Sequence, residues 1–379
     1  VPASIRERVR SAYLRRFYYR MYPENAIHRA SGPEGRPATE SQSIETPSCP
    51  STYQALVKQI DQQSDTAFEG VPDEQVAEVL SWLLVPLARN GFSSPARKSA
   101  LFRKAERAGI HLLPVHYYSP VPDTSRLDER DWEHRFDRNG GWNLNAEGQV
   151  ALLSQLAPFA GELEEIRRSP SSACAFSWDN GTFCETDAAV YYSLIRHLRP
   201  RQVLEVGAGN STLIAAEACV KNGHTELQAI DPYPLEILRQ KVPGLNRLIE
   251  GPVQRVPVAR FGELCENDIL FIDGSHVCRF GSDLNYLVFR VLPALQPGVI
   301  IHFHDIFLPW EFPRDWIVDR QLFWNEQYLL LAFLLFNDSF EVLLGTQYLG
   351  REMPGELLRV FPFLRVPGGA SFWIRRKTR

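Results

Sequence analysis

The sequence predicts an α/β protein with a doubly wound, mostly parallel sheet of seven strands and an N-terminal, mainly helical extension. Three observations lead to this fold class. From residue 188 onward, short apolar runs alternate with helical patterns. One run, residues 202–206, ends in a glycine turn that opens a helix. The last two apolar runs have no proper helix between them, which indicates a closing antiparallel hairpin.

Length and composition narrow the class of protein. The chain has 379 residues, which is room for two domains or for one large domain with an extension. A hydrophobic content of 44% is ample for a core. The net charge of −4 provides no general positive field for holding nucleic acid, so we expect no DNA partner. The oligomeric state is left open.

The cysteines and the most apolar run bear on the location of the protein. The most apolar run, residues 328–336, is far shorter than the ~20 residues that span a bilayer. We therefore expect a buried helix there, no transmembrane segment and no secretory signal. The six cysteines form no Cys-x-x-Cys pair, which favours reduced thiols of a cytoplasmic protein; they are Cys49, Cys174, Cys184, Cys219, Cys265 and Cys278.

The region before residue 188 divides by composition. Residues 1–30 form a basic segment in which arginines alternate with aromatic residues. Such a segment can form a helix that contacts a membrane surface, RNA or an import receptor, or a solvated helix held by its aromatic side chains. Residues 31–52 have the composition of a linker. Residues 53–187 are expected to form a helical and loop extension or cap, with a proline-rich aromatic loop at 109–123 over a pocket.

The remaining elements are predicted from hydrophobic periodicity. Helices are expected at residues 146–167, 188–197, 283–292 and 320–336. Strands are expected at residues 202–206, 226–231, 247–250, 268–272, 299–303, 340–344 and 371–374. The carboxyl ends of the parallel strands should lie along one edge of the sheet, where α/β proteins bind their ligands.

The first strand leads into the stretch around which the chain is organised, Glu205-Val-Gly-Ala-Gly-Asn-Ser211. Gly207 and Gly209 let the backbone turn sharply and approach a ligand closely. Ser211 and Thr212 can cap the next helix, whose N-terminal amides favour an acceptor-rich ligand. Glu205 is costly in an apolar strand unless it has a partner, so we expect it to face the ligand crevice. The stretch predicts a nucleotide-like cofactor.

Two features distinguish among such cofactors. The dinucleotide fingerprint requires a third glycine, and Thr212 occupies that position here. Asp231 ends the second strand, where a carboxylate can accept both ribose hydroxyls of NAD or of S-adenosylmethionine (SAM). The acid before the first glycine and the terminal hairpin favour SAM.

On these residues the sequence resembles the class I SAM-dependent methyltransferases, over about residues 188–374. Glu205-Val-Gly-Ala-Gly209 matches the family's Glu/Asp-x-Gly-x-Gly motif, and Asp231 matches its ribose-binding acid. The resemblance implies a Rossmann-like, SAM-binding methyltransferase domain over residues 188–379, with Tyr233 near the adenine. The implied cofactor contacts are Glu205, Gly207, Ala208, Gly209, Asn210, Ser211, Asp231 and Asp273.

The candidate catalytic residues follow the fourth and fifth strands. Strand four leads into Asp273-Gly-Ser-His276, and strand five into His304-Asp305. Because both strand ends lie beside the cofactor crevice, these four side chains should converge over the sulfonium. In one mechanism His276 is the general base for a hydroxyl or amine acceptor and Asp273 orients it. In the other, a divalent metal such as Mg or Mn acidifies an acceptor hydroxyl.

The metal alternative uses the same residues. Metal-dependent small-molecule and sugar O-methyltransferases place acids at these two strand ends, and the pattern here looks like theirs. The implied candidate ligands are Asp273, His276, His304 and Asp305. In those enzymes the fifth-strand pair is Asp-Asp or Asp-Asn, whereas here it is His304-Asp305. His302 alternates with His304 and should share its face, either near the site or as a hydrogen-bonded core histidine.

The expected acceptor is a small molecule or a glycan-like group. An aromatic loop at residues 307–316 and His116-Tyr-Tyr118 can wall a pocket for sugar faces or apolar rings, or can pack in the core. Glu311 and Asp315 would repel a highly phosphorylated acceptor. Two other functions remain open. They are non-methyl SAM chemistry, such as aminocarboxypropyl transfer or cyclisation, and a SAM-fold module that only binds a partner.

Overall fold

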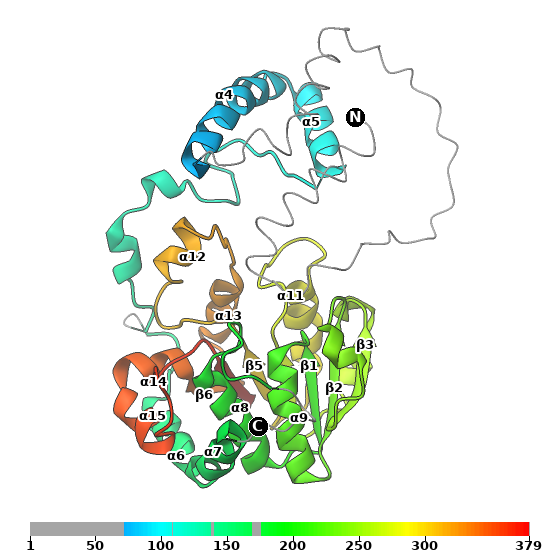
Figure 1. The fold of residues 1–379 in the computed structure, drawn as a ribbon, viewed down its shortest axis with the longest axis vertical. Coiled ribbons are helices and arrows are strands. Elements are labelled where there is room, and N and C mark those ends of the chain that lie inside the picture. The colour runs from blue at the N-terminus through cyan, green and yellow to red at the C-terminus, as the bar shows by residue number, and fades with distance from the viewer. Residues whose placement is uncertain (1–71, 108, 138–139, 169–175, 379) are drawn as a thin grey trace, which may run out of the picture. The chain divides into compact units, whose positions relative to one another are not determined.

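The sheet contains seven strands: β1 (Gln202–Val206), β2 (Glu226–Asp231), β3 (Leu245–Glu250), β4 (Ile269–Ile272), β5 (Ile300–Phe303), β6 (Phe340–Gly345) and β7 (Phe372–Arg376). Their order is β3-β2-β1-β4-β5-β7-β6. Figure 1 labels β3, β2, β1, β5 and β6 in this sheet. The first five strands pair in parallel, and β7 pairs antiparallel with both β5 and β6. The predicted fold class is confirmed.

The structure is a computed structural model that describes residues 72–107, 109–137, 140–168 and 176–378. Contacts within the chain divide it into two compact units, residues 1–122 and 123–379. The predicted basic segment at 1–30 and the linker at 31–52 lie outside the described residues. The predicted domain boundaries stay predictions.

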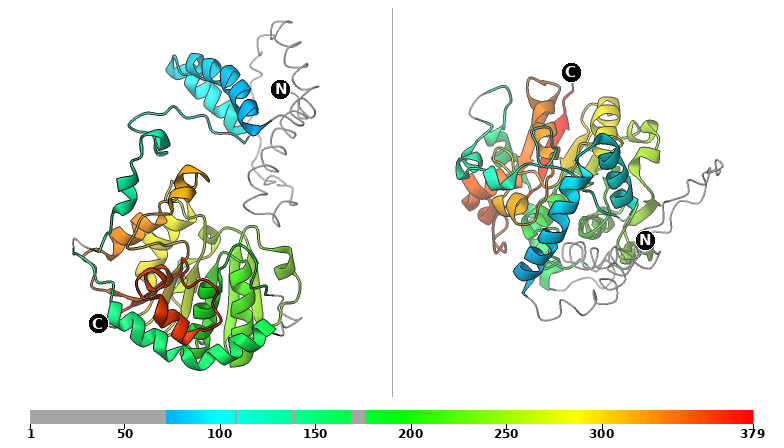
Figure 2. Two further views of the ribbon diagram at one scale, coloured as in Figure 1. Left: turned by 60° about the vertical axis from the view of Figure 1, so that its left-hand side comes forward. Right: turned by 90° about the horizontal axis from the view of Figure 1, so that it is seen from above.

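Helices cover both faces of the sheet because alternate side chains of each strand point to opposite sides. Val203 of β1 packs with α8 (Glu185–Leu198) and α9 (Asn210–Asn222). Leu204 packs with α11 (Asp283–Tyr286), with the helical turns that follow it, and with α13 (Glu326–Leu334). Figure 2 shows these layers from two further directions. The apolar run predicted as a buried helix forms most of α13.

Three predicted helices are shorter or more broken than their patterns indicated. The helix expected at 146–167 is two helices, α6 (Ala146–Gln155) and α7 (Ala160–Arg168), joined by a 3-10 turn that contains Pro158. The helix expected at 283–292 continues past α11 as π and 3-10 turns, the last containing Pro293. The segment expected at 320–336 is helical only in α13, and Gln321 before it has a φ of 53°.

The prediction that no helix separates the last two strands was wrong. Two short helices, α14 (Thr346–Glu352) and α15 (Pro354–Val360), connect β6 to β7. Pro354 begins α15 and cannot continue α14, and each helix has only seven residues, which leaves too short a window for helical periodicity to be recognised. The predicted antiparallel pairing of β6 with β7 is confirmed, and β7 lies between β6 and β5.

The described part of the first unit is helical and irregular. It contains α4 (Asp73–Gly91) and α5 (Pro95–Arg107), followed by the proline-rich segment that carries Tyr117 and Tyr118. These two tyrosines are exposed, at 94% and 85%. Their part in an acceptor pocket stays a prediction. Among the described residues, no helix has both the length and the hydropathy of a membrane span.

Candidate active site

The glycine turn after β1 is packed against the end of β4. Gly207 has a φ of 95°, which favours glycine, and a Cβ atom on it would collide with the carbonyl oxygen of Asp273. The backbone N–H of Asp273 donates to the carbonyl of Val206 at 2.8 Å. By contrast, a Cβ atom on Gly209 would meet no heavy atom within 4 Å. The turn is therefore closed on its β4 side and open at Gly209, which fits the approach of a ligand.

The turn is also tied to the end of β2. Asp231 accepts hydrogen bonds from the N–H groups of Ala208 at 2.7 Å and Tyr233 at 2.5 Å, one on each carboxylate oxygen. Burial raises the pKa of Asp231, and these two bonds act in the opposite direction. Each oxygen keeps a lone pair that a ribose hydroxyl could use. The Tyr233 side chain is 69% exposed.

The start of α9 completes the turn. The N–H of Gly209 donates to the hydroxyl of Thr212 at 3.1 Å, so this threonine caps the helix from inside its first turn. The Asn210 side chain donates to the hydroxyl of Thr182 at 2.9 Å, which connects the turn to the loop before α8. Ser211 is buried.

Glu205 lies on the face of β1 that packs against α8. Its carboxyl group has no exposed surface and accepts a hydrogen bond from the hydroxyl of Tyr191 at 2.9 Å. Burial raises the pKa of Glu205 to about 8. Tyr191 is thus the hydrogen-bond partner that a carboxyl group buried in an apolar strand was expected to have. The predicted cofactor contact of Glu205 stays a prediction.

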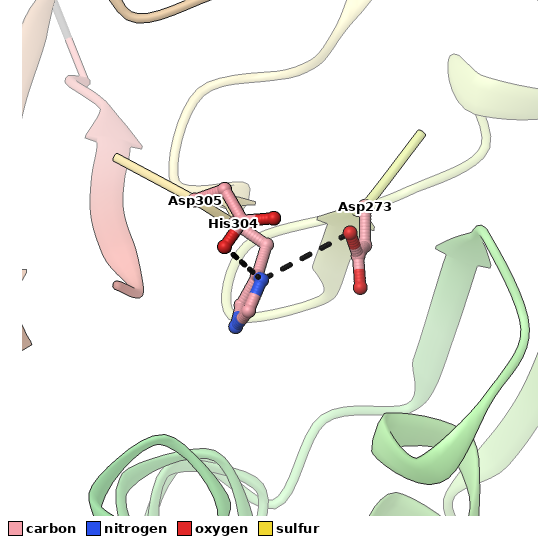
Figure 3. A group of neighbouring side chains, drawn as sticks. All are labelled: Asp273, His304 and Asp305. Carbon is pink, nitrogen blue, oxygen red and sulfur yellow. Dashed lines mark ion pairs between the residues drawn. The ribbon is translucent and has the colours of Figure 1, made fainter. Parts of the chain in front are cut away.

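The structure brings the four candidate catalytic residues together at the ends of β4 and β5. Nε2 of His276 lies 3.3 Å from Oδ1 of Asp273 and 3.5 Å from Oδ2 of Asp305. Nδ1 of His304 lies 3.3 Å from Oδ1 of Asp305 and 3.9 Å from Oδ1 of Asp273 (Figure 3). Each imidazole therefore directs one nitrogen at the same pair of carboxylates.

Both active-site imidazoles are buried among acids, and this sets their protonation. Burial lowers the pKa of His276, but hydrogen bonds to Asp273 and Glu326 and the charge of Asp305 raise it well above its usual value. Burial likewise lowers the pKa of His304, and the charges of Asp305 and Asp273 raise it well above that value. Burial raises the pKa of Asp273, but the nearby histidines hold it at about 2. The surrounding acids therefore favour the protonated form of both imidazoles, and the imidazoles favour the ionised form of Asp273.

A third acid lies beside Nδ1 of His276, the ring nitrogen that points away from Asp273 and Asp305 (the outer nitrogen). Nδ1 of His276 lies 2.8 Å from Oε2 of Glu326, the first residue of α13, and both side chains are buried. The His276 ring lies against Trp324, with 4.3 Å between the ring centroids. His276 has a φ of 58°, a conformation that non-glycine residues adopt only when the surroundings hold it.

Another acid lies beside the outer nitrogen of His304. Nε2 of His304 is 3.4 Å from Oδ2 of Asp187 in α8. Asp187 also accepts hydrogen bonds from the Thr346 hydroxyl at 2.6 Å and from the N–H groups of Ala370 and Ser371. The position of His304 therefore depends on a carboxylate that also joins α8 to the segment before β7.

His302 belongs to the core rather than to this cluster. Its ring is stacked on Phe271 at 3.8 Å and lies 4.5 Å from the Trp373 ring. Nε2 is 2.9 Å from the hydroxyl of Ser371, and burial lowers the pKa of His302 well below its usual value. His302 and His304 share a face, as alternation predicts, with 5.7 Å between their ring centroids.

Much of the aromatic loop after β5 packs inside the protein. Phe307 and Phe312 are buried in a small cluster with Trp316 and Trp324 against it. The hydroxyl of Tyr328 donates to Glu311 at 2.6 Å. Of these aromatic rings, Trp324 reaches the site, through its contact with His276. Of the two alternatives for this loop, a pocket wall or core packing, Phe307 and Phe312 follow core packing.

Sequence reasoning missed Glu326 and Asp187. Both are acids in the first turn of a helix. A carboxylate at this position normally interacts favourably with the positive end of the helix dipole and is expected to be exposed to solvent. The available signal was an acid directly beside an apolar run, at Asn325-Glu326 and in Glu185-Thr-Asp187. Their partners lie on distant parts of the chain, so periodicity does not identify them.

Known proteins resemble the region that carries this site. A family profile described as "Methyltransferase domain" matches residues 204–306, which include the glycine turn, Asp231 and the four-residue cluster. An uncharacterized protein of Archaeoglobus fulgidus is 34% identical over 166 residues, which are 41% of this chain and 75% of that protein.

Two solved structures are also similar. One is a putative O-methyltransferase from Klebsiella pneumoniae, with 14% identity, coverage of 60% of this chain and 90% of that chain, and a TM-score of 0.33. The other is a putative methyltransferase from Thermobifida fusca YX, with 17% identity, coverage of 62% and 97%, and a TM-score of 0.33.

The substitution Glu205→Gln should stabilise the protein, and more so at higher pH. An acid whose pKa is about 8 when folded and about 4.5 when unfolded costs stability as pH rises from 4.5 to 8, because only the unfolded state ionises freely. An amide oxygen can still accept the Tyr191 hydrogen bond and carries no titration. The check is urea unfolding of both proteins without cofactor at pH 5 and pH 8.5. A gain in unfolding free energy that is equal at both pH values contradicts this account.

Proposed function

We propose that this chain, which belongs to the class I SAM-dependent methyltransferase family, transfers a methyl group from SAM to an oxygen, or to a nitrogen, of a small-molecule or glycan-like acceptor. This proposal rests mainly on one observation: two acids and two histidines converge at the ends of β4 and β5, beside the glycine turn. Acid–base groups next to a methyl donor are what deprotonation of a hydroxyl or ammonium acceptor requires.

The proposed cofactor site is the turn between β1 and α9. The open side at Gly209 and the N-terminal amides of α9 support a ligand there. Asp231 would accept the ribose hydroxyls through the lone pairs that Ala208 and Tyr233 leave free. Asp273 borders the turn and would lie between the cofactor and the acceptor.

The proposed general base is His276. SAM supplies an electrophilic methyl group on a sulfonium. As the bond from the acceptor oxygen to that methyl forms and the C–S bond breaks, the hydroxyl proton passes to Nε2 of His276. Before this step the imidazole must release its Nε2 proton to water, although the raised pKa of His276 favours keeping it. A sulfonium cation nearby lowers the pKa of His276 and so favours that loss.

Coordination by a divalent metal is the second candidate mechanism for activating the acceptor. Asp273, His304 and Asp305 each offer one ligand atom, and these atoms lie within 4.8 Å of one another. Two carboxylates and an imidazole form a donor set that suits Mn²⁺, while Mg²⁺ prefers oxygen ligands alone. If bound, the cation would lower the pKa of an acceptor hydroxyl.

The substitution Asp231→Ala should weaken binding of S-adenosylhomocysteine roughly 100-fold, since it removes two charge-assisted hydrogen bonds and the anchor of the turn. Isothermal titration calorimetry measures this directly. Asp338→Ala, which removes an exposed acid, is the matched control. Unchanged affinity in Asp231→Ala would remove this residue from the cofactor site.

The substitution His276→Gln should lower turnover by about 100-fold or more while S-adenosylhomocysteine binding stays within two-fold, as loss of a general base predicts. The assay offers SAM with a panel of catechols, phenols, simple glycosides and primary amines. It measures S-adenosylhomocysteine release and product mass. His224→Gln, at an exposed histidine, is the control. Near-normal turnover in His276→Gln removes it as base. Release of methylthioadenosine by the wild type indicates aminocarboxypropyl transfer, and no binding of SAM indicates an interaction module.

Treatment with EDTA distinguishes general-base catalysis by His276 from activation of the acceptor by a bound metal. With His276 as base, we expect turnover to stay within two-fold after EDTA and dialysis, because no cation takes part. Loss of turnover that Mg²⁺ or Mn²⁺ restores, together with one equivalent of metal by elemental analysis, would assign activation by the metal instead.

A further inference from the structure

We infer that Glu326 is the positioning residue for His276 and that it fixes the ring with Nε2 directed at Asp273 and Asp305. This inference rests on the proposed function, in which Nε2 receives the acceptor proton. It replaces the arrangement expected from the sequence, in which Asp273 orients His276. Three kinds of contact join His276 to the residues at the start of α13.

The first contact is between the side chains. Oε2 of Glu326 is 2.8 Å from Nδ1 of His276, whereas the Asp273 and Asp305 oxygens lie 3.3 and 3.5 Å from Nε2. The outer nitrogen thus has a close carboxylate partner, and the inner nitrogen faces two acids at longer distances. A carboxylate can only accept a hydrogen bond, so Glu326 favours a proton on the nitrogen that faces it, Nδ1. Nε2 is then the nitrogen that exchanges a proton at the site.

The second contact is through the backbone. The carbonyl of His276 accepts hydrogen bonds from the N–H groups of Asn325 at 3.1 Å and Glu326 at 3.2 Å. The side chain of Asn325 accepts the N–H of Cys278 at 2.6 Å. The loop after β4 is therefore held at His276 and again at Cys278 by the residues that begin α13. This attachment explains how a non-glycine residue keeps a φ of 58° here.

The third contact is the ring of Trp324, which packs against the imidazole with an interplanar angle of 32°. Trp324, Asn325 and Glu326 thus hold the ring face, the backbone and the outer nitrogen of one residue. A carboxylate that served only to begin a helix would be exposed to solvent, whereas Glu326 is 3% exposed. A buried acid needs a partner, and the Glu326 carboxylate has it in His276.

The test is Glu326→Gln, which keeps the size of the side chain and its capacity for one hydrogen bond. An amide can accept from Nδ1–H or donate to Nδ1, so it no longer selects one tautomer. We expect turnover to fall about 10- to 100-fold, while the KM for the acceptor and the affinity for S-adenosylhomocysteine stay within two-fold. The matched control is Glu356→Gln, in the first turn of α15, whose acid pairs with Arg359 at the surface.

A second readout does not depend on an acceptor. In ¹⁵N-histidine-labelled protein, His276→Gln identifies the His276 imidazole signals by their loss. We expect an Nδ1–H signal of His276 shifted downfield by its hydrogen bond to a carboxylate in the wild type and in Glu356→Gln, and an upfield shift of that signal in Glu326→Gln. An unchanged Nδ1–H signal in Glu326→Gln, or turnover within two-fold of the wild type, overturns the inference. If the wild type methylates none of the panel, the proposed function fails, and the Nδ1–H signal still decides the role of Glu326.

Discussion

The site depends on the close approach of the β1 turn to the end of β4. Gly207 lies so near the Asp273 carbonyl that no side chain fits between them. The same approach is fixed by the hydrogen bond from the Asp273 N–H to Val206. As a result, the turn that is open to a ligand and Asp273, the acid that lies beside both His276 and His304, are neighbours across one strand pair. A larger residue at 207 would separate the two functions of the site.

Charge balance is the second constraint, and it follows from the first. The approach buries several ionisable groups in a small volume, and a buried charge is tolerated only when it is paired. His276 and His304 serve this purpose by lying among three acids each, with Asp273 and Asp305 at the site and a third acid behind each ring. His302, one step back along β5, has aromatic neighbours and Ser371 instead, and its pKa shifts in the opposite direction. Neighbouring acids, rather than depth alone, decide which histidines can carry charge.

The sequence was sufficient for the features that depend on local pattern and parallel-sheet topology. Strand ends of a parallel sheet meet at one edge, so Asp273 and His276 after one strand and His304 and Asp305 after the next had to converge. Gly207 and Gly209 directly follow β1, and Asp231 is the last residue of β2, so their places at the same edge of the sheet also follow from the strand pattern. The broken helices were predicted less well, because Pro158 and Pro293 interrupt apolar patterns that continue on both sides of them.

Glu326 could not be paired with His276 from the sequence, because 50 residues separate them and the pairing depends on how α13 returns to the sheet. The acid that a local reading offers His276 is Asp273, three residues away. In the folded chain Asp273 lies 3.3 Å from Nε2 instead, at a turn where His276 has a left-handed backbone conformation. The backbone of α13 holds that conformation and its first side chain takes the outer nitrogen. One helix start therefore determines both the shape of the loop and the direction in which its imidazole points.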